Sequence, residues 1–468
     1  MSNKFVKSSI IYFLGNIFLK GINFFTLPIF TRLMLPSDYG MYSLYSASLG
    51  ILMILVGLQI QGTVSLAYTN RTQEQFDSYV SNITLFPFIG VFLSIILVIL
   101  VPFSSDILSV PSKAYGIIMI FQSFFNIIIM IYQAELTIKQ KPKQHFILSI
   151  VTALVSTALS IGFILMLKDN TYFARVISGA LGNLIIMIYI YLHLWKRIDF
   201  KTLKNDWHYG LQLSLPLVFH NLSGQILNVA DRFMLVHYTS EEDVALYSFA
   251  YNLGMILQMI WLSVNNAWVP WYFDNLKRKK FNIIQEYCKE YIYFFTLITI
   301  LLILIVPELV IIMGGKQYID AIYITPLILL GYYFVFLYSF YVNFQFYREN
   351  TKLIPIATII AAVFNIIFNI IIIPKHGVLG AAMSTAISYF IMLLLHCIVT
   401  LYILKHRDFP ERYVFISSLF ISILVSISYY IMNSIIIRLI LAVSAIMIYG
   451  VHIFVILIKK RRDLKNGI

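Results

Sequence analysis

Long apolar stretches alternate with short polar segments along the whole chain. Many of the apolar stretches reach the roughly 20 residues that an α-helix needs to cross the hydrocarbon core of a bilayer. This pattern predicts an all-α, polytopic membrane protein with about 14 transmembrane helices. The predicted helices cover residues 8–34, 39–68, 79–102, 114–138, 146–167, 171–194, 211–237, 244–273, 287–312, 321–347, 352–373, 378–404, 413–432 and 435–458.

The composition agrees with this pattern. Hydrophobic residues make up 60% of the chain and charged residues 12%, whereas a soluble domain has about 45–50% and about 25%. The net charge of +13 does not indicate a nucleic-acid partner, because the basic residues form short clusters between apolar stretches. No metal-ligand cluster, phosphate-binding loop or nucleophile motif accompanies the two cysteines, Cys288 and Cys397, so nothing indicates an enzyme.

The basic clusters predict the orientation of the chain in the membrane. With the N-terminus in the cytoplasm, the connections facing the cytoplasm carry 24 lysines and arginines and those facing outward carry 4. Cytoplasmic connections are enriched in Lys and Arg. Both termini are therefore expected on the cytoplasmic side, and the short connections leave no soluble domain on either side.

A weak internal repeat predicts how the helices are grouped. "TRLMLPSDYGMYS" (31–43) and "DRFMLVHYTSEEDVALYS" (231–248) both place an arginine and Met-Leu before a polar turn and a Tyr-Ser pair. Repeats in the same orientation are typical of secondary transporters, which work by alternating access. The prediction is a six-helix bundle in 1–205, a second one in 206–408 related by a parallel pseudo-two-fold axis, and two additional helices with a basic tail in 409–468.

Polar side chains inside the predicted spans are candidates for a substrate cavity, because such groups are costly in lipid. Helical spacing places Asn16, Lys20 and Asn23 on one face of the first helix. The same spacing aligns Asn221, Gln225, Asn228 and Arg232 on the seventh. The candidate substrate-binding residues are Lys20, Arg32, Arg232, Asn16, Asn23, Asn221, Gln225, Asn228 and Arg175.

Structural roles are the alternative for these polar residues. The arginines lie toward the outer ends of their spans and could reach the membrane interface, as we expect for Lys289 and Arg438. Amides such as those of Gln122, Asn126, Gln133, Gln258 and Asn265 could equally form hydrogen bonds between helices. If a cavity exists, its excess of cations favours an anionic passenger such as a lipid pyrophosphate.

Two stretches carry a resemblance to a known family. "FNIIFNIIIIPKHGVLGAAMSTAISYF" (364–390), with Asn365, Asn369, Pro374 and Gly377, resembles the eleventh and twelfth helices of polysaccharide repeat-unit flippases. "TRLMLPSDYGMYS" is similar to the end of their first helix. These flippases belong to the multidrug/oligosaccharidyl-lipid/polysaccharide exporter superfamily.

The resemblance implies a carrier that moves undecaprenyl-pyrophosphate-linked oligosaccharide across the bacterial cytoplasmic membrane for capsule or O-antigen synthesis. It implies a cationic central cavity, to which Arg32 and Arg232 would contribute. It also implies membrane lipids, a polysaccharide polymerase and chain-length proteins as partners, a monomeric state and no cofactor; the coupling ion, proton or sodium, is left open. The alternative within the superfamily is a multidrug or cation exporter.

The sequence also gives two local expectations. Ser37 or Asp38 is expected to cap the second helix, since both side chains accept backbone hydrogen bonds at helix starts. The second expectation comes from the resemblance: fourteen helices are similar to the number in the lipid II flippase, in which the last two helices line a groove for the lipid tail. Residues 413–458 are hypothesised to do the same here.

Overall fold

The computed structural model describes residues 24–100, 112–349, 353–406 and 409–465. Every regular element within these ranges is a helix, and they contain no strand, which confirms the all-α prediction. The chain divides into two compact units, Met1–Ser248 and Phe249–Ile468. The predicted bundle boundaries at 205 and 408 stay a prediction.

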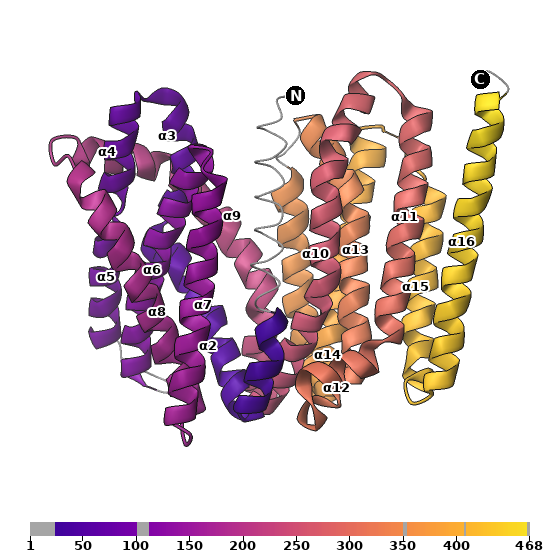
Figure 1. Cartoon of the computed structure of the whole chain (residues 1–468), viewed down its shortest axis with the longest axis horizontal. Coiled ribbons are helices and arrows are strands. Elements are labelled where there is room, and N and C mark those ends of the chain that lie inside the picture. The colour runs from indigo at the N-terminus through magenta and orange to yellow at the C-terminus, as the bar shows by residue number, and fades with distance from the viewer. Residues whose placement is uncertain (1–23, 101–111, 350–352, 407–408, 466–468) are drawn as a thin grey trace. The chain divides into compact units, whose positions relative to one another are not determined.

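The first unit is built around α6, which packs against α2, α5 and α8 (Figure 1). In the most apolar stretch of α6, 61% of the residues are buried, against 22% for α7, so α7 lies at the periphery of this unit. The described elements are the helix Phe24–Leu33, α2 (Pro36–Gly57), η1 (Ile60–Thr63), α3 (Val64–Asn70), α4 (Gln73–Ile83), α5 (Pro87–Leu100), α6 (Lys113–Ile138), α7 (Pro142–Met166), α8 (Thr171–Leu194), η2 (Trp195–Arg197), α9 (Leu203–Tyr238) and the start of α10 (Glu241–Lys277).

The second unit is built around α13, which packs against α14, α15 and α11. In α13, 83% of the most apolar stretch is buried; in α16 only 6% is, so α16 exposes an apolar surface almost all round. The elements after α10 are α11 (Phe281–Leu304), α12 (Val306–Gly314), η3 (Lys316–Tyr318), α13 (Ala321–Tyr347), α14 (Leu353–Ile398), the π-helix η4 (Val399–Ile403), α15 (Glu411–Ile431) and α16 (Ile435–Lys465).

The described helices follow the predicted spans closely. Among them, 11 are long and apolar enough to cross a membrane. One of these, Leu353–Ile403, contains two predicted helices, which meet at a kink where Gly377 adopts a φ of 52°. The predicted span 211–237 lies within α9, and the described part of the predicted first helix is Phe24–Leu33.

Three predicted helices are interrupted. The predicted 79–102 helix contains the end of α4, a turn at 84–86 and α5. The predicted 39–68 helix ends at Gly57, because Leu58 and Gln59 both adopt left-handed conformations (φ 43° and 58°) and the chain continues as η1 and α3. A left-handed residue after a helix is a common way to end it. The predicted 287–312 helix ends at Leu304, and a new helix begins just before Pro307, whose missing N–H is tolerated in a first helical turn.

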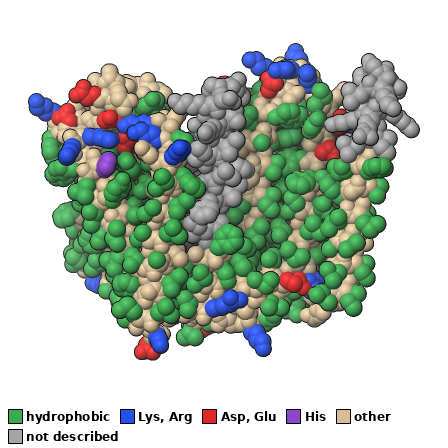
Figure 2. All heavy atoms as spheres, viewed as in Figure 1, with side chains coloured by type: hydrophobic (Ala, Val, Ile, Leu, Met, Phe, Trp, Pro, Cys, Tyr) green, Lys and Arg blue, Asp and Glu red, His purple; other side chains and the backbone are tan. Residues whose placement is uncertain are grey.

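The surface of each unit is that of a membrane protein. Figure 2 shows hydrophobic side chains covering the sides of each unit, and Lys and Arg gathered at the end of the first unit that carries α3 and α4. Large apolar side chains such as Leu97, Leu192 and Ile436 are more than half exposed. Apolar surfaces of this extent are rare on soluble monomers, so this is a multi-pass membrane protein.

Candidate functional site

Arg175 of α8 lies among side chains supplied by the 31–43 segment and the residue before it. The centre of its guanidinium is 3.3 Å from the ring centroid of Phe30 and 4.1 Å from that of Tyr42. Its Nη1 is 3.6 Å from the sulfur of Met34. Aromatic faces stabilise a cation that is removed from water. Arg175 therefore holds α8 against α2 and the helix that precedes α2.

Asp38 makes a second connection between α2 and α8. Its carboxylate accepts a hydrogen bond from the hydroxyl of Thr171 and another, of 3.2 Å, from the next backbone amide of α8. An acidic group at a helix N-terminus is favoured by the helix dipole. The expectation that Ser37 or Asp38 caps α2 is wrong, because α2 begins after Leu35 and has no side-chain cap.

Arg232 of α9 is linked to α2 through two serines. Its Nε donates to the hydroxyl of Ser248 at 3.1 Å, and its Nη1 donates to the carbonyl oxygen of Asn228 at 3.0 Å. The Ser248 hydroxyl is in turn 2.6 Å from the hydroxyl of Ser43. Ser43 directly follows Tyr42. Tyr42 of α2 thus contacts Arg175 of α8, and the next residue, Ser43, contacts Ser248, the serine that accepts a hydrogen bond from Arg232 of α9.

The other predicted residues of the first unit lie as follows. Arg32 is exposed at the end of its helix, and Asn221 is exposed on α9, where its amide donates to the carbonyl of Leu217. Gln225 is half-buried and packs on Gly50 of α2, where an added Cβ would lie 2.4 Å from the Gln225 amide nitrogen. The candidates Lys20, Asn16 and Asn23 lie outside the described residues.

The predicted amide stripes are largely connections between helices. Four of the amides bond to a side chain of a neighbouring helix over 2.7–3.2 Å. The pairs are Gln122 with Tyr45, Asn126 with Asn183, Gln133 with Ser149, and Asn265 with Asn343. Of the two roles that the sequence left open, hydrogen bonding between helices holds for these four residues.

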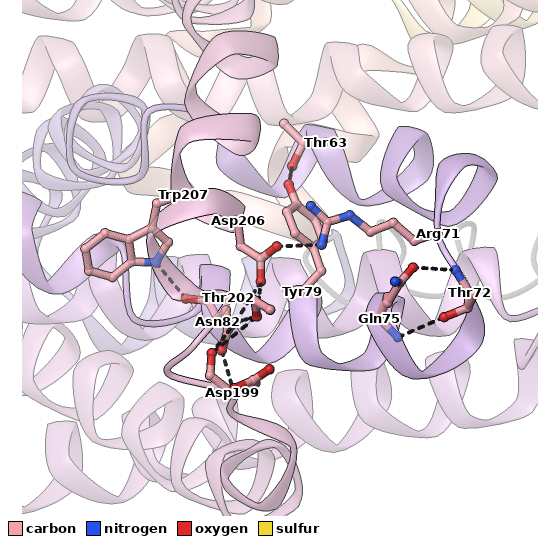
Figure 3. Close-up of polar contacts among 10 residues, drawn as sticks. All are labelled: Thr63, Arg71, Thr72, Gln75, Tyr79, Asn82, Asp199, Thr202, Asp206 and Trp207. Atoms are coloured by element: carbon pink, nitrogen blue, oxygen red, sulfur yellow. Dashed lines mark hydrogen bonds and ion pairs between the residues drawn. The ribbon is translucent and has the colours of Figure 1, made fainter.

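A polar network that the sequence did not predict joins α4 to the start of α9 (Figure 3). Arg71 and Asp206 form an ion pair with 2.5 Å between Nη1 and Oδ1, and the Asp206 side chain is only 2% exposed. The guanidinium also lies 4.4 Å from the ring centroid of Tyr79 and 5.0 Å from that of Tyr209. The pair and its rings fix the position of the α9 N-terminus.

Asn82 is the centre of this network (Figure 3). Its side-chain amide lies within 2.7–3.0 Å of the Asp206 carboxylate, the Thr202 hydroxyl and the backbone carbonyl of Asp199. Its side-chain oxygen accepts the backbone N–H of Asp199 at 3.0 Å, and its own carbonyl accepts the Trp207 indole N–H at 2.9 Å. The polar atoms of Asn82 are thus satisfied although its side chain is fully buried. This side chain therefore connects the end of α4 to the segment between α8 and α9.

A second charged cluster lies at the same end of the first unit. Glu135 is buried and its Oε1 accepts from Lys139 at 2.5 Å and from Arg197 at 2.9 Å. Lys139 also reaches a carboxylate oxygen of Asp77 at 2.5 Å. The sequence assigned Arg71, Lys139 and Arg197 to membrane orientation alone. The structure adds that all three are partners of buried or half-buried carboxylates.

Arg438 of α16 differs from its prediction. It was expected to extend to the membrane interface, but it is 6% exposed and makes two hydrogen bonds of 2.6 and 2.7 Å to the carboxylate of Glu308. A third, of 2.7 Å, reaches the carbonyl of Leu304. A buried arginine needs such a paired acceptor. Arg438 therefore holds α16 to the α11–α12 corner.

An apolar groove of about 550 Å³ lies between α11, α15 and α16. Leu297, Phe420 and Ile448 are among the side chains that line it. At one end His452 Nε2 is 3.0 Å from a carboxylate oxygen of Glu290. No group of three or more His, Cys, Asp or Glu side chains within the described ranges is arranged to hold a metal ion.

Comparisons with known proteins agree with this architecture. The family model described as polysaccharide biosynthesis protein matches residues 5–276, more than half of the chain, and the MatE family model matches residues 216–371. Among solved structures, the lipid II flippase MurJ in an inward closed conformation has a TM-score of 0.75 at 20% identity, covering 96% of this chain and all of that one. An inward-facing multidrug resistance MATE family transporter has a TM-score of 0.62 at 14% identity, with 92% and 99% coverage.

Two curated relatives extend along most of the chain. "Lsg locus putative protein 1" of Haemophilus influenzae is 27% identical over 83% of this chain and 98% of its own length. "Probable low-salt glycan biosynthesis flippase Agl15" of Haloferax volcanii is 22% identical, over 83% of this chain and 82% of its own. The resemblance to polysaccharide flippases is confirmed, and so is the expectation of a transporter rather than an enzyme. The chain belongs to the polysaccharide biosynthesis protein family, within the multidrug/oligosaccharidyl-lipid/polysaccharide exporter superfamily.

Proposed function

We propose that the chain moves oligosaccharide repeat units linked to undecaprenyl pyrophosphate from the cytoplasmic to the outer leaflet of the bacterial cytoplasmic membrane. The flipped units would supply a capsule or O-antigen polymer. The observation that carries this proposal is that the polysaccharide biosynthesis family match, residues 5–276, contains the arginines Arg32, Arg175 and Arg232, which lie on the helix Phe24–Leu33, α8 and α9. Arg32 and Arg232 are assigned to pyrophosphate binding, together with Lys20 and Arg175.

The chemistry of the passenger suits these residues. A guanidinium group binds phosphate oxygens through paired, charge-assisted hydrogen bonds, and these are stronger where water is scarce. The exposed amides of Asn221 and Asn228 on α9 add donors and acceptors of the kind that bind sugar hydroxyls. Asn16, Asn23 and Gln225 are assigned the same role.

The groove between α11, α15 and α16 is proposed to hold part of the prenyl tail. It is lined mainly by apolar side chains, and α16 is apolar on almost all sides. Exchanging one hydrocarbon neighbour for another in a membrane changes the free energy little, so the tail could enter and leave readily. Charged substitutions at Phe420 and Ile448 should slow transport if the tail uses this groove.

The lysine and arginine distribution supports cytoplasmic termini. In this orientation transport would proceed by alternating access and without a cofactor, and its coupling to a proton gradient, a sodium gradient, the membrane potential or none of these is left open. The expected partners are the lipid-linked oligosaccharide, membrane lipids, a polymerase and chain-length proteins, but no nucleic acid, and the protein is expected to act as a monomer.

The test is a lipid extraction from a strain that lacks the gene. We expect a polyprenyl-pyrophosphate oligosaccharide to accumulate and surface polysaccharide to be lost, with the passenger identified by its mass. Complementation with Lys20→Ala, Arg32→Ala, Arg232→Ala combined should fail, while the exposed-surface control Arg278→Ala should restore the polymer. Normal export by the triple variant would contradict the role of the cations.

A multidrug or cation exporter is the second candidate function. The MatE match over residues 216–371 and the MATE-like fold favour it. On this alternative the deletion strain would keep a normal lipid pool and intact surface polysaccharide, and would become sensitive to cationic drugs. Drug sensitivity with an unchanged lipid pool would therefore overturn the flippase proposal.

A further inference from the structure

A cleft of about 520 Å³ lies between α6, α7 and α8 in the first unit. These three helices lie side by side in Figure 1 and pack against one another. The cleft is formed by the C-terminal ends of α6 and α8 and the N-terminal end of α7. None of the residues assigned above to substrate binding lines it.

The lining of the cleft is apolar on one side. Ile147 and Val151 of α7 and Ile186 of α8 form this wall, next to Tyr189. Ile147 is 59% exposed, and it belongs to an α7 surface on which Leu154 is also more than half exposed. Because only 22% of the most apolar stretch of α7 is buried, this wall is open at the surface of its unit.

Toward the helix ends, beyond this wall, the cleft is polar and basic. This end is formed by Lys141, Gln144, His193 and Arg197. Both charged residues in the lining are cations. The larger groove beside Arg71 differs, because its lining includes the carboxylates of Glu74, Asp77, Asp199 and Asp206 as well as cations.

The two cations are available to a ligand. Lys141 is exposed, and none of the ion pairs among the described residues includes it. Arg197 donates through Nη1 to Glu135 at 2.9 Å and keeps 33% of its side chain exposed. That ion pair fixes the guanidinium at the edge of the cleft, so binding an anion would cost little side-chain entropy.

The depth of the cleft matches the headgroup region. Exposed Tyr189 and Trp195 lie at this end of α8 and η2, and Tyr and Trp are enriched where membrane and water meet. The basic residues at this end of the unit mark it as the cytoplasmic end. Basic clefts between transmembrane helices on that side are suited to anionic lipid headgroups.

We infer that this cleft binds an anionic phospholipid of the cytoplasmic leaflet. Its phosphate lies between Lys141 and Arg197, with Gln144 and His193 as hydrogen-bonding neighbours, and one acyl chain follows Ile147 and Val151. The observation behind the assignment is that one cleft combines an end with two cations and no lining carboxylate with an apolar wall formed by Ile147, Val151 and Ile186. The inference does not depend on which passenger the protein carries.

The experiment measures lipid retention by native mass spectrometry of the purified full-length protein. Phosphatidylglycerol and phosphatidylethanolamine with the same acyl chains are added in turn, and the wild-type protein should retain the anionic lipid preferentially. Lys141→Gln should weaken phosphatidylglycerol binding about fivefold, the factor for about 1 kcal/mol per interfacial cation. The matched control is Lys143→Gln, an exposed lysine of the same helical turn that does not line the cleft.

A second pair of variants tests the apolar wall without changing charge. Ile147→Trp should fill the cleft and reduce binding, whereas Ile185→Trp, at an exposed position of α8 outside the lining, should not. Soluble glycerol phosphate at the same concentration should not displace the lipid. Equal retention of both lipids, equal losses in Lys141→Gln and Lys143→Gln, or a preference for polyprenyl phosphate over phosphatidylglycerol would each overturn the assignment.

Discussion

At the scale of single residues, several charges inside this protein are held by partners far away in the sequence. Asp206 lies 135 residues beyond Arg71, and Asn82 meets Asp199 across 117 residues. Helical periodicity relates residues three or four positions apart, so it could not reveal these pairs. It could identify Arg175 and Arg232 as embedded charges, because their apolar surroundings are local in the sequence.

The Arg71–Asp206 pair gives a prediction about stability. Arg71→Ala leaves the buried Asp206 carboxylate without its cation, so the free energy of unfolding should fall by about 3 kcal/mol. Arg278→Ala, which removes an exposed pair with Asp274 of 3.0 Å, should cost about 0–1 kcal/mol. Thermal unfolding of the purified variants in one detergent measures the difference. Equal melting temperatures for the two variants would show that the network adds nothing to stability.

Variants at Arg232 and Ser43 can distinguish a role of the Arg232 charge in substrate binding from a structural role of this residue. Arg232→Ala should reduce polysaccharide export at least about tenfold if a cation is needed for a pyrophosphate, since charge-assisted hydrogen bonds contribute about 1.5–3 kcal/mol. Ser43→Ala removes the serine–serine hydrogen bond of 2.6 Å and leaves the guanidinium in place. It should export normally. Export is measured in the deletion strain at matched expression, and equal losses in both variants would indicate a structural role for Arg232.

At the scale of helices, the sequence predicted where the helices lie along the chain better than where they are interrupted. A run of apolar residues reports where a chain can cross a membrane, and each described span overlaps a predicted one. The break at Leu58–Gln59 has no glycine or proline at the left-handed positions. It is fixed by packing instead, because Ile60, Thr63 and Val64 are fully buried behind it. By contrast, Pro374 and Gly377 correctly marked the kink within α14.

The contact between α2 and the start of α10 depends on one glycine. A Cβ at Gly40 would lie 1.9 Å from the carbonyl oxygen of Glu241, and a backbone atom cannot move aside as a side chain can. Gly40→Ala should therefore destabilise the first unit, by about 1–3 kcal/mol or more. Gly224→Ala in α9, where no atom lies within 4 Å, should be neutral or stabilise by about 0.5–1 kcal/mol. Comparing melting temperatures of these two variants checks the contact, and a Gly40→Ala protein as stable as wild type would refute it.

At the scale of the whole molecule, the sequence predicted the class of protein and the family, since both follow from composition and from motifs within single helices. For the candidate site the sequence proposed the cations Lys20, Arg32, Arg175 and Arg232, and the structure adds how Arg175 and Arg232 are held. Arg175 contacts Tyr42, and Arg232 reaches Ser43 through Ser248. That α2 lies between these arginines is a property of helix packing, which no local pattern reports. The roles of Lys20, Asn16 and Asn23 stay predictions.

The orientation of the chain can be tested at the two ends of one helix. Lys143 and Lys168 are both exposed, at opposite ends of α7, and the lysine and arginine distribution places Lys143 in the cytoplasm and Lys168 outside. A membrane-impermeant maleimide should therefore label Lys168→Cys in intact cells and Lys143→Cys only after permeabilisation. The wild-type protein supplies the background, which should be low because Cys288 is buried and Cys397 lies within a membrane helix. The reverse labelling pattern would invert the topology, and with it the leaflet from which a passenger is collected.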